Sequence, residues 1–158
     1  MKINSVDIMK LQIPEGTQIR PVICRINTDE GISGLGEACV AIVTGAHAAA
    51  EEIKDLSRFI IGMDPLAHEQ IWEKLFRLSF WGKGNGGIVM AAISAIDTAL
   101  WDIKGKFYNA PVYALLGGKQ RNCLRAYASQ LQFGWGKEKT QFCGALSEYE
   151  AACEAALE

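Results

Sequence analysis

The sequence predicts an α+β fold in which a three-stranded antiparallel meander is followed by a helical bundle and then by a single βα unit. Apolar and polar residues alternate in the early segments, which is typical of half-buried strands. Apolar residues then recur every three or four positions up to Phe107, which indicates amphipathic helices. After Gly118 a short strand-like segment precedes a last helical one. These observations predict two parts, residues 1–118 and residues 119–158.

Three strands are predicted over residues 2–12, 22–28 and 32–40. The first two segments alternate apolar and polar side chains, so one face of the resulting sheet is apolar. The turn between the second and third strands, DEG at residues 29–31, is short enough for a hairpin. Its glycine supplies the positive φ that such turns need. Strands joined by short turns pair antiparallel, which predicts the meander.

Three helices are predicted next, over residues 45–61, from Asp64 to residue 80, and from Ile88 to Phe107. Asp64 is expected to cap the second helix, with Pro65 in its first turn. The third helix carries two stripes at helical spacing. The first is apolar and the second is made of small residues that permit close packing: Ile93, Ile96, Leu100, Ile103 and Phe107, and Ala91, Ala95 and Ala99. A short helical turn is expected around residues 111–116.

Residues 123–128 are predicted to form a strand, and a helix is predicted from Ser147 onward. Ser147 and Glu150 have the spacing of a capping box. The helical pattern reaches Glu158 without a stop signal. We therefore expect the 158 residues to be the N-terminal part of a longer protein, because one βα unit cannot bury both of its faces.

Composition argues against several classes of partner. The chain has 16 basic and 18 acidic residues, a net charge of -2, and no basic cluster, so neither a nucleic acid nor a membrane surface is expected as partner. No segment approaches the roughly 20 apolar residues of a membrane span, and the N-terminus lacks a signal-peptide core. A cytoplasmic location is therefore expected. The five cysteines include no CxxC pair, and we expect them to be reduced and mostly buried.

Two local patterns resemble chemical motifs but have structural interpretations. Gly82, Gly84 and Gly87 match G-x-G-x-x-G, yet a dinucleotide site needs this motif between a strand and a helix. Here a helical pattern precedes the glycines, so a loop between helices is predicted. Asp97 and Asp102 lie five positions apart on the third helix and therefore point to different sides. We expect Asp102 to pair with Lys106 and Asp97 to bond a neighbouring backbone group, with a direct chemical role as the alternative.

Residues 91–118, AAISAIDTALWDIKGKFYNAPVYALLGG, resemble the first signature of the mandelate racemase and muconate-lactonizing enzyme family, within the enolase superfamily. The segments TDEGISGLGEA and IIGMDPLAHEQIWEKLF are also similar to that family, so the resemblance covers the whole chain. It implies an enolase-type capping domain at residues 1–118. It further implies that residues 119–158 hold the first strand, a loop and the start of the first helix of a (β/α)8 barrel whose remainder is absent.

The resemblance implies abstraction of the proton next to a carboxylate, with Mg²⁺ stabilising the enediolate. The segment LRAYASQLQFGWG is most similar to acid-sugar dehydratases, which then eliminate water. A racemase, epimerase or cycloisomerase of the same superfamily is the alternative. In the family, the metal ligands and catalytic bases lie on later barrel strands. No catalytic residue and no metal ligand is therefore expected within residues 1–158, and the chain alone is expected to be inactive.

The resemblance also implies that two loops of the capping domain, residues 14–21 and 41–47, close over the barrel mouth. Ser129 and the residue after it are expected at the end of the first barrel strand. The residues hypothesised to contact a sugar-acid substrate are Arg20, His47, Trp81 and Gln130. Packing or surface roles are the alternative for each. Further copies of the chain are the expected macromolecular partner. A hypothesis of another class is a free-standing cap that acts as a binding or assembly module.

Overall fold

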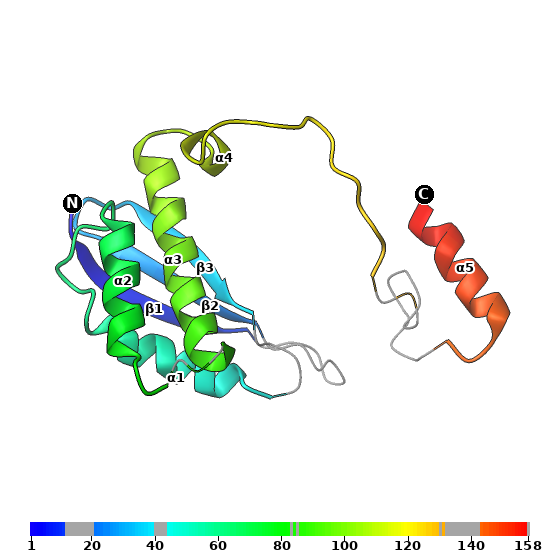
Figure 1. Cartoon of the computed structure of the whole chain (residues 1–158), viewed down its shortest axis with the longest axis horizontal. Coiled ribbons are helices and arrows are strands. Elements are labelled where there is room, and N and C mark those ends of the chain that lie inside the picture. The colour runs from blue at the N-terminus through cyan, green and yellow to red at the C-terminus, as the bar shows by residue number, and fades with distance from the viewer. Residues whose placement is uncertain are drawn as a thin grey trace. The chain divides into compact units, whose positions relative to one another are not determined.

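The computed structural model describes residues 1–11, 21–39, 44–82, 84, 86–129, 131 and 143–157. They form two compact units, Met1–Gly118 and Lys119–Glu158 (Figure 1). The first unit contains β1 (Ile3–Lys10), β2 (Val22–Thr28), β3 (Ser33–Ala38), α1 (Ala46–Ser57), α2 (His68–Leu78), α3 (Gly87–Phe107) and α4 (Val112–Leu115). The second contains α5 (Leu146–Leu157). The first unit confirms the predicted α+β class.

The sheet is the predicted meander, with the strand order β1-β2-β3 and antiparallel pairing throughout. Gly31 adopts a φ of 81° in the β2–β3 turn, and its N–H donates to the carbonyl oxygen of Thr28 at 3.2 Å. The register places Lys10 opposite Val22, and Val22 opposite Ala38. These three residues therefore form a row at one end of the sheet.

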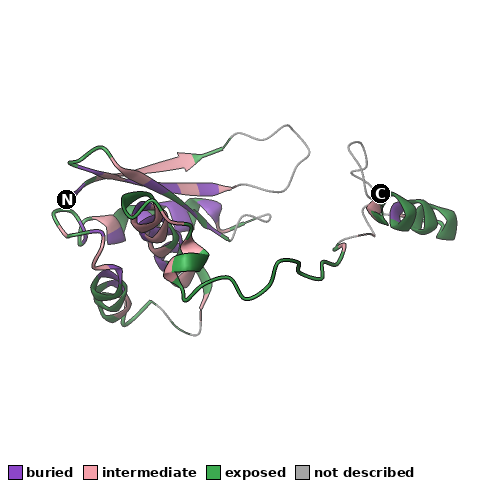
Figure 2. Cartoon of the chain, turned by 90° about the horizontal axis from the view of Figure 1, so that it is seen from above, coloured by how far each residue is buried: buried purple, intermediate pink, exposed green. Residues whose placement is uncertain are grey.

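Helices α1 and α3 cover one face of the sheet, and α2 packs on α3 as a further layer (Figure 1). The buried residues gather where these layers meet (Figure 2). The sheet contributes the predicted apolar face of β2, and α3 contributes the predicted apolar stripe. The fully buried members are Val22, Cys24, Ile26, Ile93, Ile96, Leu100 and Ile103. The alternation in β2 and the helical spacing in α3 thus predicted which side of each element faces the core.

The backbones of α3 and β3 approach each other closely. A Cβ placed on Gly34 would overlap the carbonyl oxygen of Ala99, and one on Gly36 would overlap that of Ala95. Ala95 and Ala99 belong to the predicted stripe of small residues and are fully buried. Glycines on the strand and alanines on the helix therefore set the spacing between these two elements.

The predicted start of the second helix was wrong. Helix α2 begins at His68, and Asp64 instead organises a separate turn before it. The Oδ1 atom of Asp64 accepts a hydrogen bond from the N–H of Leu66 at 3.0 Å, and its carbonyl accepts one from Ala67 at 3.1 Å. A side chain that accepts from the second residue after it forms an Asx turn, which the cap pattern in the sequence does not distinguish from a helix start. Likewise α1 ends at Ser57, and turns follow it.

In the second unit, described residues 123–128 do not form the predicted strand. A strand is defined by its hydrogen-bonded neighbours, and the described part of this unit offers none. Helix α5 begins at Leu146, so the capping box predicted at Ser147 and Glu150 was wrong. Glu148 caps the helix instead, and its Oε2 accepts from the N–H groups of Gly144 and Ala145 at 2.6 and 3.1 Å.

The cysteines are free, but they are not mostly buried as predicted. Only Cys24 is buried, because it lies on the inner face of β2. Burial raises the pKa of its thiol to about 12. Cys143 is partly exposed, and the others are exposed: Cys39, Cys123 and Cys153. None of the helices in the described part of the chain has the length and apolar character needed to cross a membrane.

Candidate functional site

One end of the sheet is where the two predicted substrate loops begin. The row of Lys10, Val22 and Ala38 lies there, so the segment from β1 to β2 and the segment that follows β3 leave the sheet side by side. The N–H of Leu11 donates to the carbonyl of Pro21 at 3.4 Å, which closes the base of the first loop. Residues 12–20 and 40–43 lie outside the described residues.

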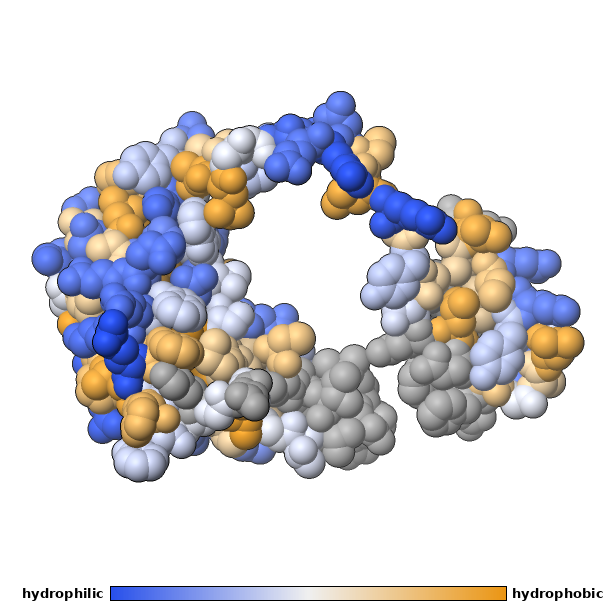
Figure 3. Space-filling model, viewed as in Figure 1, coloured by the Kyte–Doolittle hydropathy of each residue, from blue (hydrophilic) through white to orange (hydrophobic). Residues whose placement is uncertain are grey.

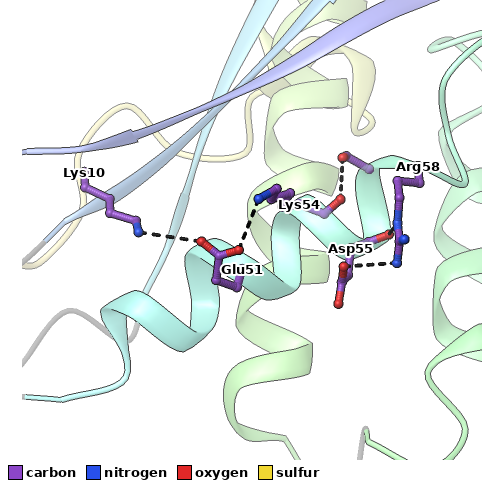
Figure 4. Close-up of polar contacts among 6 residues, drawn as sticks. Lys10, Glu51, Lys54, Asp55 and Arg58 are labelled. Atoms are coloured by element: carbon purple, nitrogen blue, oxygen red, sulfur yellow. Dashed lines mark hydrogen bonds and ion pairs between the residues drawn. The ribbon is translucent and has the colours of Figure 1, made fainter.

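Two helices begin near the same end. Helix α3 runs antiparallel to β3, because Gly34 faces Ala99 while Gly36 faces Ala95, which is one turn nearer the helix start. The first half of α3 therefore lies toward Ala38. Helix α1 is joined to the end of β1 by Lys10, whose Nζ lies 3.8 Å from Oε1 of Glu51 (Figure 4).

The outer side of α1 carries further local ion pairs (Figure 4). Glu51 also pairs with Lys54 at 3.4 Å, and Asp55 pairs with Arg58 at 3.0 Å. All of these side chains are largely exposed, so each pair contributes only about 0.2–1 kcal/mol. Both pairs lie within α1, so they support the helix locally and do not connect it to other elements.

The predicted substrate contacts are only partly visible. Arg20 and Gln130 lie outside the described residues. His47 is exposed in the first turn of α1 and makes no hydrogen bond or ion pair with another described residue. Trp81, between α2 and α3, is 94% exposed, and its ring stands edge-on to that of Phe80 at 4.9 Å. Ser129 is exposed. No polar or ring contact joins His47 to Trp81, so the described residues do not assemble the predicted set.

Asp102 is a structural residue. Its Oδ2 accepts from the Nζ of Lys106 at 2.8 Å, which confirms the predicted ion pair. The same oxygen accepts from the backbone N–H of Leu35 at 2.9 Å. The backbone contact predicted for Asp97 therefore belongs to Asp102, because that side of α3 faces the edge strand β3. Asp97 makes no hydrogen bond with another described residue.

A polar cluster between α2 and α3 was not predicted. His68 is buried in the first turn of α2, and its ring lies 4.3 Å from that of Trp101. Its Nδ1 lies 3.2 Å from the Nζ of Lys104. Because an ammonium group only donates, Nδ1 must accept, and the ring proton then resides on Nε2. Nε2 lies 3.4 Å from a carboxylate oxygen of Glu69 but forms no hydrogen bond.

This cluster connects α2 to α3 rather than forming a site. The only sequence signal for it was one histidine at an apolar position of α2, in register with Ile71 and Leu75. Asp97, on the adjoining helix, is half-buried, and loss of solvation raises the pKa of its carboxyl above the usual 3.8. Within the described ranges, no three His, Cys, Asp or Glu side chains gather to hold a metal ion.

The raised pKa of Asp97 predicts a pH-dependent contribution to stability. The folded state binds the Asp97 proton more tightly than the unfolded state, so this contribution is present at low pH. It is lost as pH rises from 3.8 through the raised value. We expect Asp97→Asn to be more stable than the parent at about pH 7 and to lose this advantage toward about pH 4. Urea unfolding across that range measures this, with Asp55→Asn as the exposed control. A difference that grows as pH falls contradicts the prediction.

The comparison with family models decides the assignment. The model of the mandelate racemase/muconate lactonizing enzyme N-terminal domain matches residues 6–117. The chain belongs to this family. The match begins within β1 and covers the rest of the sheet and α1 to α4, so in the mandelate racemase family this α+β unit is the N-terminal domain.

Curated relatives also support the assignment of this chain to the mandelate racemase family. A D-galactonate dehydratase family member from Pseudarthrobacter chlorophenolicus is 46% identical over 108 residues, which are 67% of this chain and 25% of that protein. A D-galactonate dehydratase from Pectobacterium atrosepticum is 44% identical over 110 residues, which are 69% of this chain and 28% of that protein. The matched part of the chain thus spans about a quarter of these relatives' length.

Solved structures extend the likeness to the whole chain. An enolase-superfamily member from Salmonella Typhimurium is 52% identical with a TM-score of 0.90, and the match covers 99% of this chain and 40% of that one. The 3,6-anhydro-D-galactonate cycloisomerase from Zobellia galactanivorans is 33% identical with a TM-score of 0.67, covering 76% of this chain and 33% of that one. These likenesses confirm the resemblance to the enolase superfamily and the capping-domain fold.

Proposed function

We propose that this chain is the capping portion of an acid-sugar dehydratase. The observation that carries the proposal is the match, at 44–46% identity, to proteins named D-galactonate dehydratase or placed in that family. In the proposed reaction a base removes the proton next to the substrate carboxylate, which leaves an enediolate. The enediolate electrons then form a carbon–carbon double bond as hydroxide leaves the neighbouring carbon, and protonation makes it water. The resulting enol converts to a 2-keto acid.

The contribution of this chain is to bind and enclose the substrate. The two loops that leave the sheet beside Lys10, Val22 and Ala38 would cover the bound substrate. The paired ends of the three strands would hold these loops in place. Arg20, at the end of the first loop, would bind the substrate carboxylate, since a guanidinium binds carboxylates in two-pronged geometry. His47, Trp81 and Gln130 would contact the sugar hydroxyl groups or the carbon chain.

Mg²⁺ would be held outside the described residues. It prefers carboxylate oxygen ligands, and the described residues offer no cluster of them. We therefore propose no metal-binding role for these residues. Lys119–Glu158 would be the first strand and helix of the (β/α)8 barrel, whose other residues would supply the base and the metal ligands.

A cycloisomerase is the second candidate function. The Zobellia galactanivorans cycloisomerase shares the fold over 76% of this chain. Cycloisomerases, racemases and epimerases of this superfamily would share the first step and differ in what the enediolate does next. The free-standing binding module is a third hypothesis, and it predicts that the protein catalyses no reaction.

The test is to express the uninterrupted reading frame that contains this chain and to supply it with Mg²⁺ and a panel of sugar acids including D-galactonate. A dehydratase produces a 2-keto-3-deoxy acid, which is detected with semicarbazide. The same reactions in D2O report exchange of the proton next to the carboxylate. Exchange without the keto product would identify an isomerase, and neither signal with any sugar acid would favour the binding module.

Replacing Arg20 tests the substrate-binding role of the cap. We expect Arg20→Ala to lower kcat/KM about tenfold, chiefly by raising KM, because a charge-assisted contact to the substrate is lost. Arg25→Ala is the matched control, since Arg25 pairs with Asp7 on the sheet at 2.7 Å and lies in β2. Equal kinetic constants for Arg20→Ala and the parent enzyme would show that Arg20 does not touch the substrate.

A further inference from the structure

Strand β3 lies at one edge of the sheet, so every second residue points its backbone N–H and C=O groups away from β2. The N–H of Thr28 donates to the carbonyl oxygen of Ile32 at 3.2 Å, which makes this pair face inward. Because inward and outward positions alternate along the strand, the backbone groups of Ser33 and Leu35 point outward. Outward groups of this kind can pair with a strand of another molecule.

Two side chains of α3 bind these outward groups. The Oδ2 atom of Asp102 accepts from the N–H of Leu35 at 2.9 Å, and the Nζ atom of Lys106 donates to the carbonyl oxygen of Ser33 at 2.7 Å. Asp102 and Lys106 are joined to each other at 2.8 Å and lie one helical turn apart. Both side chains therefore project from the same side of α3 onto the edge of β3.

The two contacts reproduce the hydrogen bonds of one residue in a parallel neighbouring strand. In a parallel ladder, a single residue donates to the carbonyl of the residue before its partner and accepts from the N–H of the residue after it. Opposite Gly34, these two groups belong to Ser33 and Leu35. Lys106 thus takes the place of the neighbour's N–H, and Asp102 takes the place of its carbonyl oxygen.

The opposite edge of the sheet is also bonded at one position, but by backbone groups. Ile3 of β1 donates to the carbonyl oxygen of Met63 at 2.9 Å and accepts from the N–H of Gly62 at 2.8 Å. At the β3 edge, the side chain of Leu35 is 48% exposed. Figure 3 shows further hydrophobic residues exposed among hydrophilic ones on the first unit. Without the two side chains of α3, an incoming strand would meet apolar surface as well as hydrogen-bonding groups.

We propose that Asp102 and Lys106 block the edge of β3 against pairing with a strand of a second copy of this chain. Each contact is a hydrogen bond to a charged group, and such bonds are stronger than those between neutral groups. An incoming strand would have to displace both side chains before it could pair. Charged side chains are one of the means by which proteins protect sheet edges. This role is independent of the proposed reaction.

Removing both side chains tests the proposal. We expect Asp102→Ala/Lys106→Ala to strengthen self-association of the purified protein about tenfold, which is the effect of one or two newly available hydrogen bonds. Sedimentation detects assemblies heavier than the parent, and thioflavin T detects extended sheets. Leu75→Ala is the control, because Leu75 is fully buried in α2 and its loss weakens the core without opening the edge. The variants are compared at temperatures that leave equal fractions folded, as measured by circular dichroism.

A proline separates edge pairing from general loss of stability. In the double-alanine variant, Leu35→Pro removes the N–H that the first two changes have freed. Self-association should then return to the parental level, although the protein becomes less stable. Aggregation that is caused by lost stability would increase instead. A folded proline variant that associates as strongly as the double-alanine variant overturns the proposal.

Hydrogen exchange of residues 33–38 gives a measurement that does not depend on the proline variant. In the double-alanine variant, these amides should exchange faster than in the parent in dilute solution. Their protection should rise with protein concentration as edges pair. The proposal fails if protection stays constant with concentration, or if the double-alanine variant associates no more than Leu75→Ala does.

Discussion

Replacing Gly36 with alanine is expected to lower the free energy of unfolding by about 3–5 kcal/mol. The added Cβ would overlap the carbonyl oxygen of Ala95, which belongs to the backbone of α3 and cannot move away as a flexible side chain could. Removing this overlap requires α3 to move away from β3, which would break the contacts around Ala99 and Ile103. Because the core lies between this helix and the sheet, the cost extends beyond one contact.

A second glycine provides the control. Gly62 has a φ of 80°, and no atom lies within 4 Å of the position its Cβ would take. Gly62→Ala should therefore cost only the backbone strain of a left-handed residue, roughly 1–2 kcal/mol. Urea unfolding followed by circular dichroism measures both variants. Equal losses for Gly36→Ala and Gly62→Ala would mean that close packing of α3 on β3 does not dominate at Gly36.

Replacing Asp102 with alanine is expected to cost about 2 kcal/mol. The change removes the acceptor for the N–H of Leu35 and the partner of Lys106 in one step. Lys106 also donates to the carbonyl oxygen of Ser33 at 2.7 Å, so Asp102 helps to hold this cation over the edge strand. The loss is moderate rather than large because the Asp102 side chain is partly exposed and water replaces some of these contacts.

Two comparisons separate the contributions of Asp102. Asp102→Asn keeps an oxygen that can accept from Leu35 and loses only the charge, so it should lose less stability than the alanine variant. Asp55→Ala removes an acid whose ion pair with Arg58 lies within α1, and it should change stability by no more than about 0.5 kcal/mol (Figure 4). A cost for Asp102→Ala as small as that for Asp55→Ala would show that the contact to β3 contributes little.

Local periodicity predicted most of the first unit. The alternation in β1 and β2 and the long stripes of α3 each reflect one buried side of one element, so a short stretch of sequence contains the signal. The ends of elements were predicted less well. Asp64 and Ser147 each carried a valid cap signal, but Asp64 forms a separate turn and Glu148 caps α5. Cap residues also occur in turns, and the packing around them selects between the two.

The candidate site was only partly predictable. The family resemblance indicated which loops and which residues to consider, among them Arg20 and His47. The resemblance alone did not indicate that both loops begin at the same end of the sheet. That arrangement depends on the pairing of Lys10 with Val22 and of Val22 with Ala38. The polar cluster at His68 was missed for the same reason, since Lys104 is 36 positions away from it in sequence.

The sequence by itself determined the class of the fold, the sheet order, the helix at α3 and the family. Each of these depends on spacing within a segment or on one continuous signature. Only the tertiary structure decided the roles of particular residues: Asp102 bonds the backbone of Leu35, 67 positions away, and Gly36 is a glycine because Ala95 lies against it. It also left residues 123–128 without a strand partner among the described residues. These outcomes depend on which distant groups come within bonding or contact distance, and short-range patterns do not contain that information.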